Sequence, residues 1–292
     1  MKLKSSTLFL AGAVLLCMST AFAQTYTFQT INYPGDTFTQ LLGINNHNVI
    51  AGYHGASVNQ GFTYVLKTNT FTTENFPGSQ QTQVIGIANT SNTAGFYISA
   101  GGATVGFVDR QGTFTSVAYP NQPFNQLLSE NDVAQAAGYY STKADGSGPD
   151  TPYIYDELGG VFEGLVIPNA VTAQATGINN SGNTCGFYVN AGGVNRGWLL
   201  VGGHYTVLNY PGSTGTQALG LNNHGSVVGF YTDSSGGSHG FVYNVSSKAF
   251  QSIDDPSGVG TTIVNGVNDS GMLVGFYGTA PVNSGFVASP AP

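Results

Sequence analysis

The chain has 292 residues, and only 7% of them are Asp, Glu, Lys or Arg, against about 25% in a typical soluble domain. Gly supplies 42 residues, roughly twice its usual share, and aromatic residues reach 12%. Few charges and many aromatics exclude intrinsic disorder and long exposed helices, and glycines without a three-residue period exclude a collagen-like chain. The composition therefore favours a Gly-rich, all-β protein.

Residues 1–23 have the features of a secretory signal peptide. Lys2 and Lys4 precede a short apolar run at 8–16, and a small-residue cleavage site ends at Ala23. The run is shorter than the ~20 residues that a membrane span requires. We expect cleavage after Ala23 and export to the periplasm or the extracellular space, with a lipid on Cys17 as the alternative.

Cleavage would leave a strongly acidic chain with one cysteine. The formal net charge of −7 becomes −9 when Lys2 and Lys4 are removed, which argues against binding to nucleic acid or to an anionic membrane surface. Cys185 would then have no partner for an intramolecular disulfide. Stability must come from a buried core, and roughly 73% of the unfolded surface can be buried at this length.

After one β-like run at Tyr26–Ile31, a segment of the type Gly-Ile-Asn-Asn recurs six times along residues 24–292. The six segments begin at Gly43, Gly86, Ser129, Gly177, Gly220 and Gly266. A Gly stands nine positions after each start, an aromatic residue follows that Gly, and a Pro-containing turn such as Tyr33-Pro34-Gly35 precedes each segment. We interpret residues 24–292 as one domain of six repeats.

Each repeat contains several short runs of β-forming residues separated by turn residues. In the fifth repeat the runs are 216–222, 226–231, 239–245 and 249–253. Four strands in about 43 residues, repeated several times, are typical of propeller blades. The sequence therefore predicts a six-bladed β-propeller with four antiparallel strands in each blade.

The two ends of the chain predict how the ring closes. The last repeat has runs at 263–268, 272–277 and 285–288 and lacks a fourth, whereas Tyr26–Ile31 has no hairpin partner. We expect this N-terminal strand to complete the C-terminal blade, which would remove open sheet edges. The alternative is an open or solenoid stack, although neither end resembles a polar cap.

The repeats resemble the bacterial extracellular HAF-repeat family over residues 25–288. The resemblance rests on the Gly-Ile-Asn-Asn-x-Gly-x-x-x-Gly-Phe-Tyr segments and on a downstream triplet, of which His239-Gly240-Phe241 is the nearest match. Four other repeats carry related triplets, such as Arg196-Gly197-Trp198, and the third repeat lacks one. The resemblance implies a secreted bacterial repeat protein and transfers no catalytic residues.

Five repeats place a glutamine three positions before the segment start. These residues are Gln40, Gln83, Gln126, Gln174 and Gln217, and Ile263 interrupts the series. If the strand that carries them is innermost, the amides would ring the mouth of the central channel, where they could bind a sugar because each amide both donates and accepts hydrogen bonds. Alternatively, each amide bonds the backbone of the neighbouring blade and helps to seat that blade.

Asn or Asp recurs at the second and third positions after the segment start. The third position is Asn46, Asn89, Asp132, Asn180, Asn223 and Asp269. Such side chains could supply oxygen ligands to calcium or contact a sugar. The alternative is Asx-turn chemistry in a hairpin.

The third repeat breaks the pattern and gathers half of the acidic residues. Seven of the chain's 14 Asp and Glu residues lie between Glu130 and Glu163. We consider a cation site, with calcium as the candidate ion, formed by Glu130, Asp132, Asp145 and Asp150, although their spacing matches no calcium-loop motif. The alternative is a solvated loop.

Together these patterns favour a non-catalytic binding or surface-interaction module without a cofactor, which we expect to be a monomer and to bind a glycan or an extracellular protein. The alternatives are an extracellular polysaccharide hydrolase or lyase and a passive cell-surface or matrix protein. An enzyme would need carboxylates that converge near the channel with raised pKa, whereas amides and hydroxyls would favour binding. Cys185 and Trp198 are expected to be buried filler.

Overall fold

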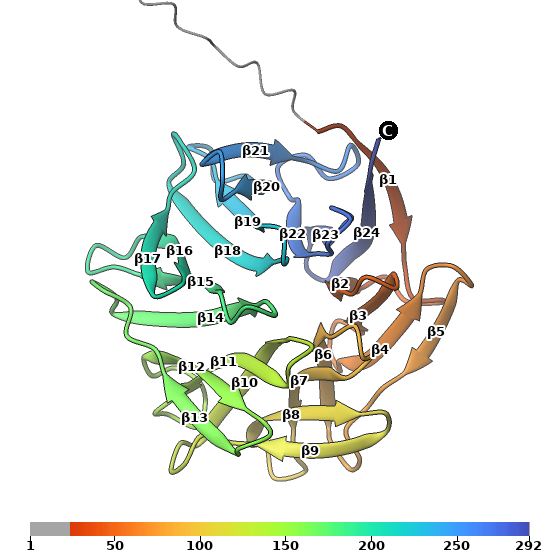
Figure 1. Cartoon of the computed structure of the whole chain (residues 1–292). Coiled ribbons are helices and arrows are strands. Elements are labelled where there is room, and N and C mark those ends of the chain that lie inside the picture. The colour runs from red at the N-terminus through yellow and green to blue at the C-terminus, as the bar shows by residue number, and fades with distance from the viewer. Residues whose placement is uncertain (1–23, 292) are drawn as a thin grey trace, which may run out of the picture.

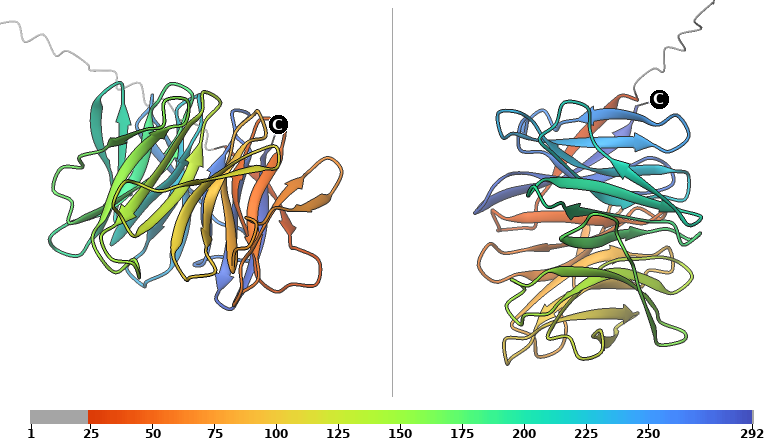
Figure 2. Two further views of the ribbon diagram at one scale, coloured as in Figure 1. Left: turned by 90° about the horizontal axis from the view of Figure 1, so that it is seen from below. Right: turned by 90° about the vertical axis from the view of Figure 1, so that its left-hand side faces the viewer.

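A computed structural model describes residues 24–291, so the predicted signal peptide at 1–23 lies outside the described residues. The described chain forms six four-stranded antiparallel sheets arranged as blades around a central channel (Figure 1). Seen edge-on, the blades form a thick ring (Figure 2). The predicted six-bladed β-propeller is confirmed over residues 24–291. No helix in the described part of the chain is long and apolar enough to cross a membrane.

The strands of each blade are given in order from the channel outward. Blade 1 consists of β2 (Thr39–Ile44), β3 (Val49–His54), β4 (Gln60–Val65) and β5 (Thr70–Thr73). Blade 2 consists of β6 (Gln81–Ile87), β7 (Thr93–Ile98), β8 (Thr104–Arg110) and β9 (Thr113–Val117). Blade 3 consists of β10 (Phe124–Glu130), β11 (Gln135–Ser141), β12 (Asp150–Asp156) and β13 (Val161–Gly164).

The other three blades follow the same order. Blade 4 consists of β14 (Thr172–Ile178), β15 (Thr184–Val189), β16 (Asn195–Val201) and β17 (His204–Leu208). Blade 5 consists of β18 (Gly215–Leu221), β19 (Ser226–Thr232), β20 (Ser238–Asn244) and β21 (Ala249–Ile253). Blade 6 consists of β22 (Ile263–Val267), β23 (Leu273–Thr279), β24 (Val282–Pro290) and β1 (Tyr26–Ile31).

The N-terminal strand closes the ring, as predicted. β1 pairs with β24 in antiparallel register from Tyr26 opposite Pro290 to Ile31 opposite Gly285, and the two strands run side by side in Figure 1. Blade 6 therefore contains both ends of the described chain and contacts blade 1. The alternative of an open stack is wrong, because the first and last repeats meet.

The glycine nine positions after each segment start makes room inside its own blade. A Cβ at Gly186 would lie 1.9 Å from the carbonyl oxygen of Gln174 on the inner strand and 2.7 Å from the ring of Trp198. Trp198 pairs directly with Gly186 across β15 and β16 and is fully buried. Each blade repeats this arrangement of a glycine opposite a large buried ring; the rings are Phe62, Phe107, Tyr153, Trp198, Phe241 and Phe286.

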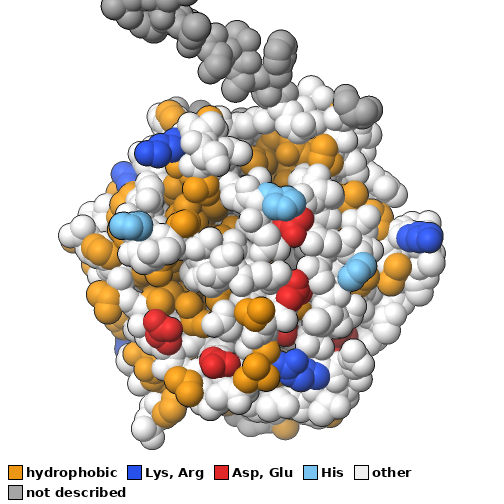
Figure 3. All heavy atoms as spheres, in the orientation of Figure 1, with side chains coloured by type: hydrophobic (Ala, Val, Ile, Leu, Met, Phe, Trp, Pro, Cys, Tyr) orange, Lys and Arg blue, Asp and Glu red, His pale blue; other side chains and the backbone are white. Residues whose placement is uncertain are grey.

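Stacking of blade on blade explains the scarcity of charge. The second strand of a blade is covered on both faces, so β7 buries five consecutive residues, Thr93–Tyr97, where a strand with one wet face would alternate. The inner strands keep alternation because one side lines the channel. Charged side chains are scattered over the face shown in Figure 3, and most of that face is neutral.

We predict that Gly186→Ala destabilises the fold by about 1 to 3 kcal/mol, because the new methyl group overlaps a backbone oxygen that cannot move without disturbing β14. The control is Gly101→Ala, where the nearest atom to an added Cβ is 3.9 Å away and the change should stay within about 0.5 kcal/mol. Chemical denaturation of both variants measures the difference. Equal stability of the two variants would contradict this account of the glycine.

Candidate functional site

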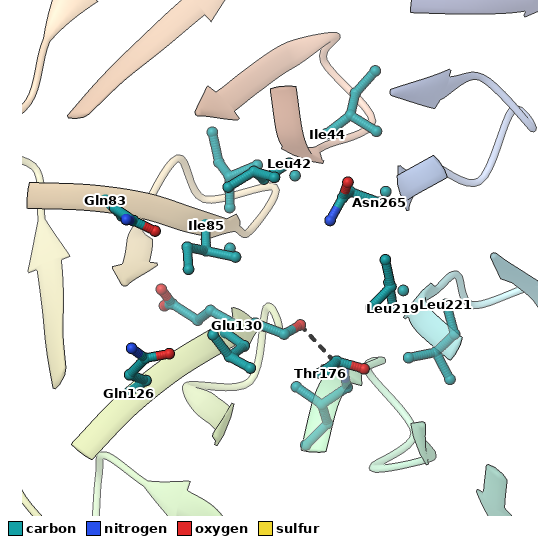
Figure 4. Close-up of a pocket in the computed structure, with 18 of the residues that line it drawn as sticks. Leu42, Ile44, Gln83, Ile85, Gln126, Glu130, Thr176, Leu219, Leu221 and Asn265 are labelled. Atoms are coloured by element: carbon teal, nitrogen blue, oxygen red, sulfur yellow. Dashed lines mark hydrogen bonds between the residues drawn. The ribbon is translucent and has the colours of Figure 1, made fainter. Parts of the chain in front are cut away.

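The six inner strands enclose a cavity of about 300 Å³ in the central channel. Because alternate residues of a strand point to the same side, alternate side chains of each inner strand line the channel (Figure 4). They therefore form successive levels along the strand direction. We call the level near the start of the inner strands the upper level; it contains the predicted glutamines. The next level, which we call the middle ring, consists of Leu42, Ile85, Leu128, Thr176, Leu219 and Asn265.

Four of the five predicted glutamines line the cavity, namely Gln40, Gln83, Gln126 and Gln174. Gln217 occupies the same position on β18 but is not among the residues that line the cavity. The predicted position of the series on the innermost strands is correct for all five.

Protein contacts hold Gln40 at both ends, since its Oε1 accepts from the Tyr53 hydroxyl at 2.6 Å and its Nε2 donates to Asn283 Oδ1 at 3.5 Å. The other three lining amides are held at one end. Gln83 Nε2 donates to Asn59 Oδ1 of blade 1 at 2.7 Å, and Gln174 Nε2 donates to Asp150 Oδ2 of blade 3 at 2.7 Å. Gln126 Oε1 accepts from the Tyr139 hydroxyl at 2.8 Å. Gln83 and Gln174 therefore bond side chains of the neighbouring blade and not its backbone, whereas Gln126 bonds a residue of its own blade. Each of these three amides has one end without a hydrogen-bond partner among the described residues.

Aromatic side chains complete the amide level of the cavity. Tyr53, Phe96 and Phe187 follow the repeat glycines on the second strands and line the cavity beside the amides. These aromatics are visible in the sequence as part of the repeat, but they were not predicted as site residues. The signal was their pairing position, since Phe96 lies directly opposite Gln83 and Phe187 opposite Gln174 in the register of the strands.

At the other end of the channel, the third-position Asn and Asp residues form a closed circle of hydrogen bonds, which we call the Asx ring. Its members are Asn46, Asn89, Asp132, Asn180, Asn223 and Asp269. The backbone N–H of each member donates to the side-chain oxygen of the next member around the ring, at 2.6 to 2.9 Å. These contacts join blade to blade, so the predicted role of this position in a hairpin Asx turn is wrong.

The two aspartates give the Asx ring its balance of donors and acceptors. Asp132 Oδ2 accepts from the side-chain amides of Asn89 and Asn180, and Asp269 Oδ2 accepts from those of Asn46 and Asn223. Burial alone would raise the pKa of Asp269, but the amides of Asn223 and Asn46 hold it below its ordinary value. Every side-chain amide in the ring thus has an acceptor. The space that the ring encloses has a volume of about 70 Å³.

The second-position asparagines form the predicted Asx turns. Asn179 Oδ1 accepts from the backbone N–H groups of Ser181 and Asn183, while Asn179 Nδ2 donates to the carbonyl of Asn222 in the next blade at 3.0 Å. The same pattern occurs at Asn45, Asn131, Asn222 and Asn268. Both ends of each of these side chains are hydrogen-bonded within the protein, so their oxygens are not available to a cation.

The four acids of the predicted cation site do not come together. Asp150 pairs with Ser141 at one end of blade 3, whereas Glu130 pairs with Ala136 at the opposite end. Asp132 belongs to the Asx ring, and the Asp145 carboxylate accepts from the backbone N–H of Ser147 in an exposed loop. Asp145 and Asp150 thus lie at one end of blade 3, and Glu130 and Asp132 lie at the other, so these four acids form no common site.

Glu130 is the only carboxylate that the described cavity lining contains, apart from the Asx ring. It occupies the position of Ile44 and Ile87 in other blades and is 5% exposed, and its carboxylate has no hydrogen-bond partner among the described residues. Burial raises the pKa of Glu130 to about 9, repulsion by Glu157 adds to the rise, and Arg110 partly opposes it. In Figure 4 the carboxylate is directed toward the neighbouring blade rather than the channel centre.

His239 and two carboxylates form a cluster outside the channel. His239 contacts Asp254 at 2.8 Å and Asp233 at 3.2 Å, and thereby ties the β19–β20 loop to the loop before β22. Burial alone would lower the pKa of His239, but these carboxylates raise it.

Cys185 is fully buried, and burial raises the pKa of its thiol to about 12. Cys185 and Trp198 belong to the core, as predicted.

No family model and no curated protein matches this sequence. Among solved structures, the chain is similar to a lectin from Aleuria aurantia in complex with Fucα1-6GlcNAc, with 10% identity and a TM-score of 0.53 over 88% of this chain and 99% of that one. Another structure of that lectin is described as a six-bladed β-propeller with a novel fucose recognition mode. A propeller domain of a protease from Pyrococcus furiosus shares 9% identity, with a TM-score of 0.51 over 88% and 96% of the two chains. At these identities the likeness shows the propeller fold alone.

We predict that Glu130→Ile raises the melting temperature, and that the gain is larger at pH 8 than at pH 4. Because the pKa of Glu130 in the folded state is about 9 and lies near 4.3 in an unfolded chain, the folded state binds more protons, so the wild-type protein loses stability as pH rises from about 4 toward 9. The measurement is thermal unfolding across that range. Glu163→Gln on the exposed β13 is the control for a change in net charge, and a gain independent of pH would refute the assignment.

Proposed function

We propose that this chain is a secreted, non-catalytic carbohydrate-binding protein whose site is the cavity of the central channel. The proposal includes its export by the predicted signal peptide and its membership of the HAF-repeat family. One observation carries it: glutamine amides with unpaired ends and aromatic rings surround one level of a single cavity. Amides match the hydroxyls of a sugar, which both donate and accept, and aromatic rings match its apolar face.

The size and polarity of the cavity support a small neutral ligand. About 300 Å³ lies at the lower end of the range found for small-molecule sites, which suits one or two sugar units. The described lining contains amides, aromatics, aliphatic side chains, hydroxyls and the single carboxylate of Glu130, so it has no pair of carboxylates of the kind that a glycosidase uses. The lectins among the structural neighbours support the proposal, since propellers of this shape can carry sugar sites.

We predict that Gln83→Leu and Gln126→Leu each weaken binding of a neutral glycan by about tenfold, because each removes a hydrogen bond and leaves a sugar hydroxyl unpaired. Gln217→Leu is the matched control, since Gln217 has the same repeat position but does not line the cavity. A glycan array would find the ligand, and calorimetric titration would compare the variants. Equal affinities for the wild type and the three variants would place the binding site elsewhere.

The same ligand separates binding from catalysis. After long incubation with the glycan, chromatography should return the intact compound. A cleaved product that disappears in the Gln83→Leu variant would instead favour the polysaccharide hydrolase or lyase.

A further inference from the structure

The side chains that line the cavity change from polar to apolar along the channel. Between the upper level and the Asx ring lie the middle ring, in which four of six members are Leu or Ile, and one further level. We call this further level the lower ring; its members are Ile44, Ile87, Glu130, Ile178, Leu221 and Val267. Five of these six are aliphatic, so the two rings surround the deep part of the cavity mainly with hydrocarbon (Figure 4).

A β-bulge in every inner strand places the middle-ring residue at the channel. In β2, Leu41 pairs with Gly52 and Gly43 pairs with Ala51, so Leu42 between them has no pairing partner. The same break in register occurs at the other five members, Ile85, Leu128, Thr176, Leu219 and Asn265. Bulges turn a side chain out of the ordinary alternation and are frequent beside functional sites. They leave Ile85, Leu128 and Leu219 only partly buried, so aliphatic surface lines the cavity without a protein partner.

The polar side chains of the two rings offer few hydrogen bonds to a ligand. The Thr176 hydroxyl donates to the carbonyl of Ala218 at 2.9 Å. Asn265 Oδ1 and both carboxylate oxygens of Glu130 are buried in the wall, and the Glu130 carboxylate is directed toward the neighbouring blade in Figure 4. A hydroxylated sugar unit at these levels would leave most of its hydroxyls unpaired, which is unfavourable.

The far end of the channel favours a ligand that ends at the lower ring. The Asx ring follows the lower ring and encloses only about 70 Å³, and its side-chain amides already bond within the protein. The group that fits the two aliphatic rings is therefore a short hydrocarbon that enters from the upper level, since each buried methylene stabilises the complex. A sugar with an alkyl chain on its anomeric oxygen combines hydroxyls at one end with hydrocarbon at the other.

We propose that the channel selects sugars that carry a short alkyl aglycone, with the sugar at the upper level and the alkyl chain within the middle and lower rings. This inference rests on the proposed function, because it requires that a sugar lie among the glutamine amides. It names the ligand class as an alkyl glycoside, in place of a chain of hydroxylated sugar units. Successive levels are two residues apart along the strand, or about 7 Å, so an alkyl chain of about four to six carbons extends from the sugar into the rings.

The test compares methyl, butyl and hexyl β-D-glucosides by calorimetric titration of the whole protein. The affinity should rise about threefold for each added methylene, or roughly thirtyfold from methyl to butyl, because each methylene moves from water to an aliphatic wall. Cellobiose, which has a second sugar unit in place of the alkyl chain, should bind no more tightly than the methyl glucoside.

Leu219→Asn tests the aliphatic rings, because it introduces the residue that blade 6 has at this level. It should reduce the gain from methyl to butyl at least about fivefold and leave the affinity for the methyl glucoside near that of the wild type. Val207→Asn is the matched control, since Val207 is exposed on β17, the outermost strand of blade 4, and it should leave the gain unchanged. Leu128→Thr, which introduces the residue of blade 4, is the second variant if Leu219→Asn lowers the melting temperature.

The outcomes separate the inference from the proposed function. Equal affinities for the three glucosides, all weakened in Gln83→Leu, would overturn the ligand class and leave the channel as a sugar site. A chain-length gain that persists in Leu219→Asn and Leu128→Thr would place the alkyl chain elsewhere and also overturn the inference. Affinities that are unchanged in Gln83→Leu and Gln126→Leu would overturn the proposed function and the inference with it. If no glucoside binds, the inference is overturned, and the glycan array decides the proposed function separately.

Discussion

The circle of hydrogen bonds formed by the Asx ring is the constraint on which the channel depends. Ten hydrogen bonds join the six blades at this ring, six from backbone N–H groups and four from side-chain amides. Because every member both donates and accepts, no blade can shift without breaking bonds on both sides. The ring therefore fixes the inner strands at one end, and the side chains higher on those strands converge around a cavity of defined width.

The same ring explains why the repeat is not perfectly regular. In a ring of six asparagines, each Oδ1 would have to accept from both a backbone N–H and a side-chain amide. An aspartate in every third blade supplies the extra oxygen, and Asp132 and Asp269 stand in blades 3 and 6. These are also the blades with Glu130 and Asn265 at the channel. Departures from the repeat thus balance the scaffold in one case and create chemical asymmetry in the cavity in the other.

The sequence predicts the fold well because the fold repeats. Six equivalent segments reveal the blades, and the unmatched strand at 26–31 reveals the closure. The site is harder to predict because it depends on contacts between blades. The Asx ring joins residues 43 or more positions apart, and the cation site fails because the register separates Asp150 from Glu130 along one blade. The local sequence does not reveal that Gln83 lines the cavity and Gln217 does not, or that Asn265 Oδ1 lacks a hydrogen-bond partner. Both properties depend on where the side chains lie in the assembled ring.

We propose that the ligand binds at the upper level of the channel, among the glutamine amides, and not at the Asx ring or the outer loops. The most direct measurement is the NMR spectrum of the side-chain amide groups, assigned by mutation and recorded during titration with a glycan that binds. The signals of Gln83, Gln126 and Asn265 should shift on binding, while those of Gln217 and Asn223 should stay in place. Shifts at Gln217 or in the Asx ring, with the signals of Gln83 and Gln126 unmoved, would contradict it.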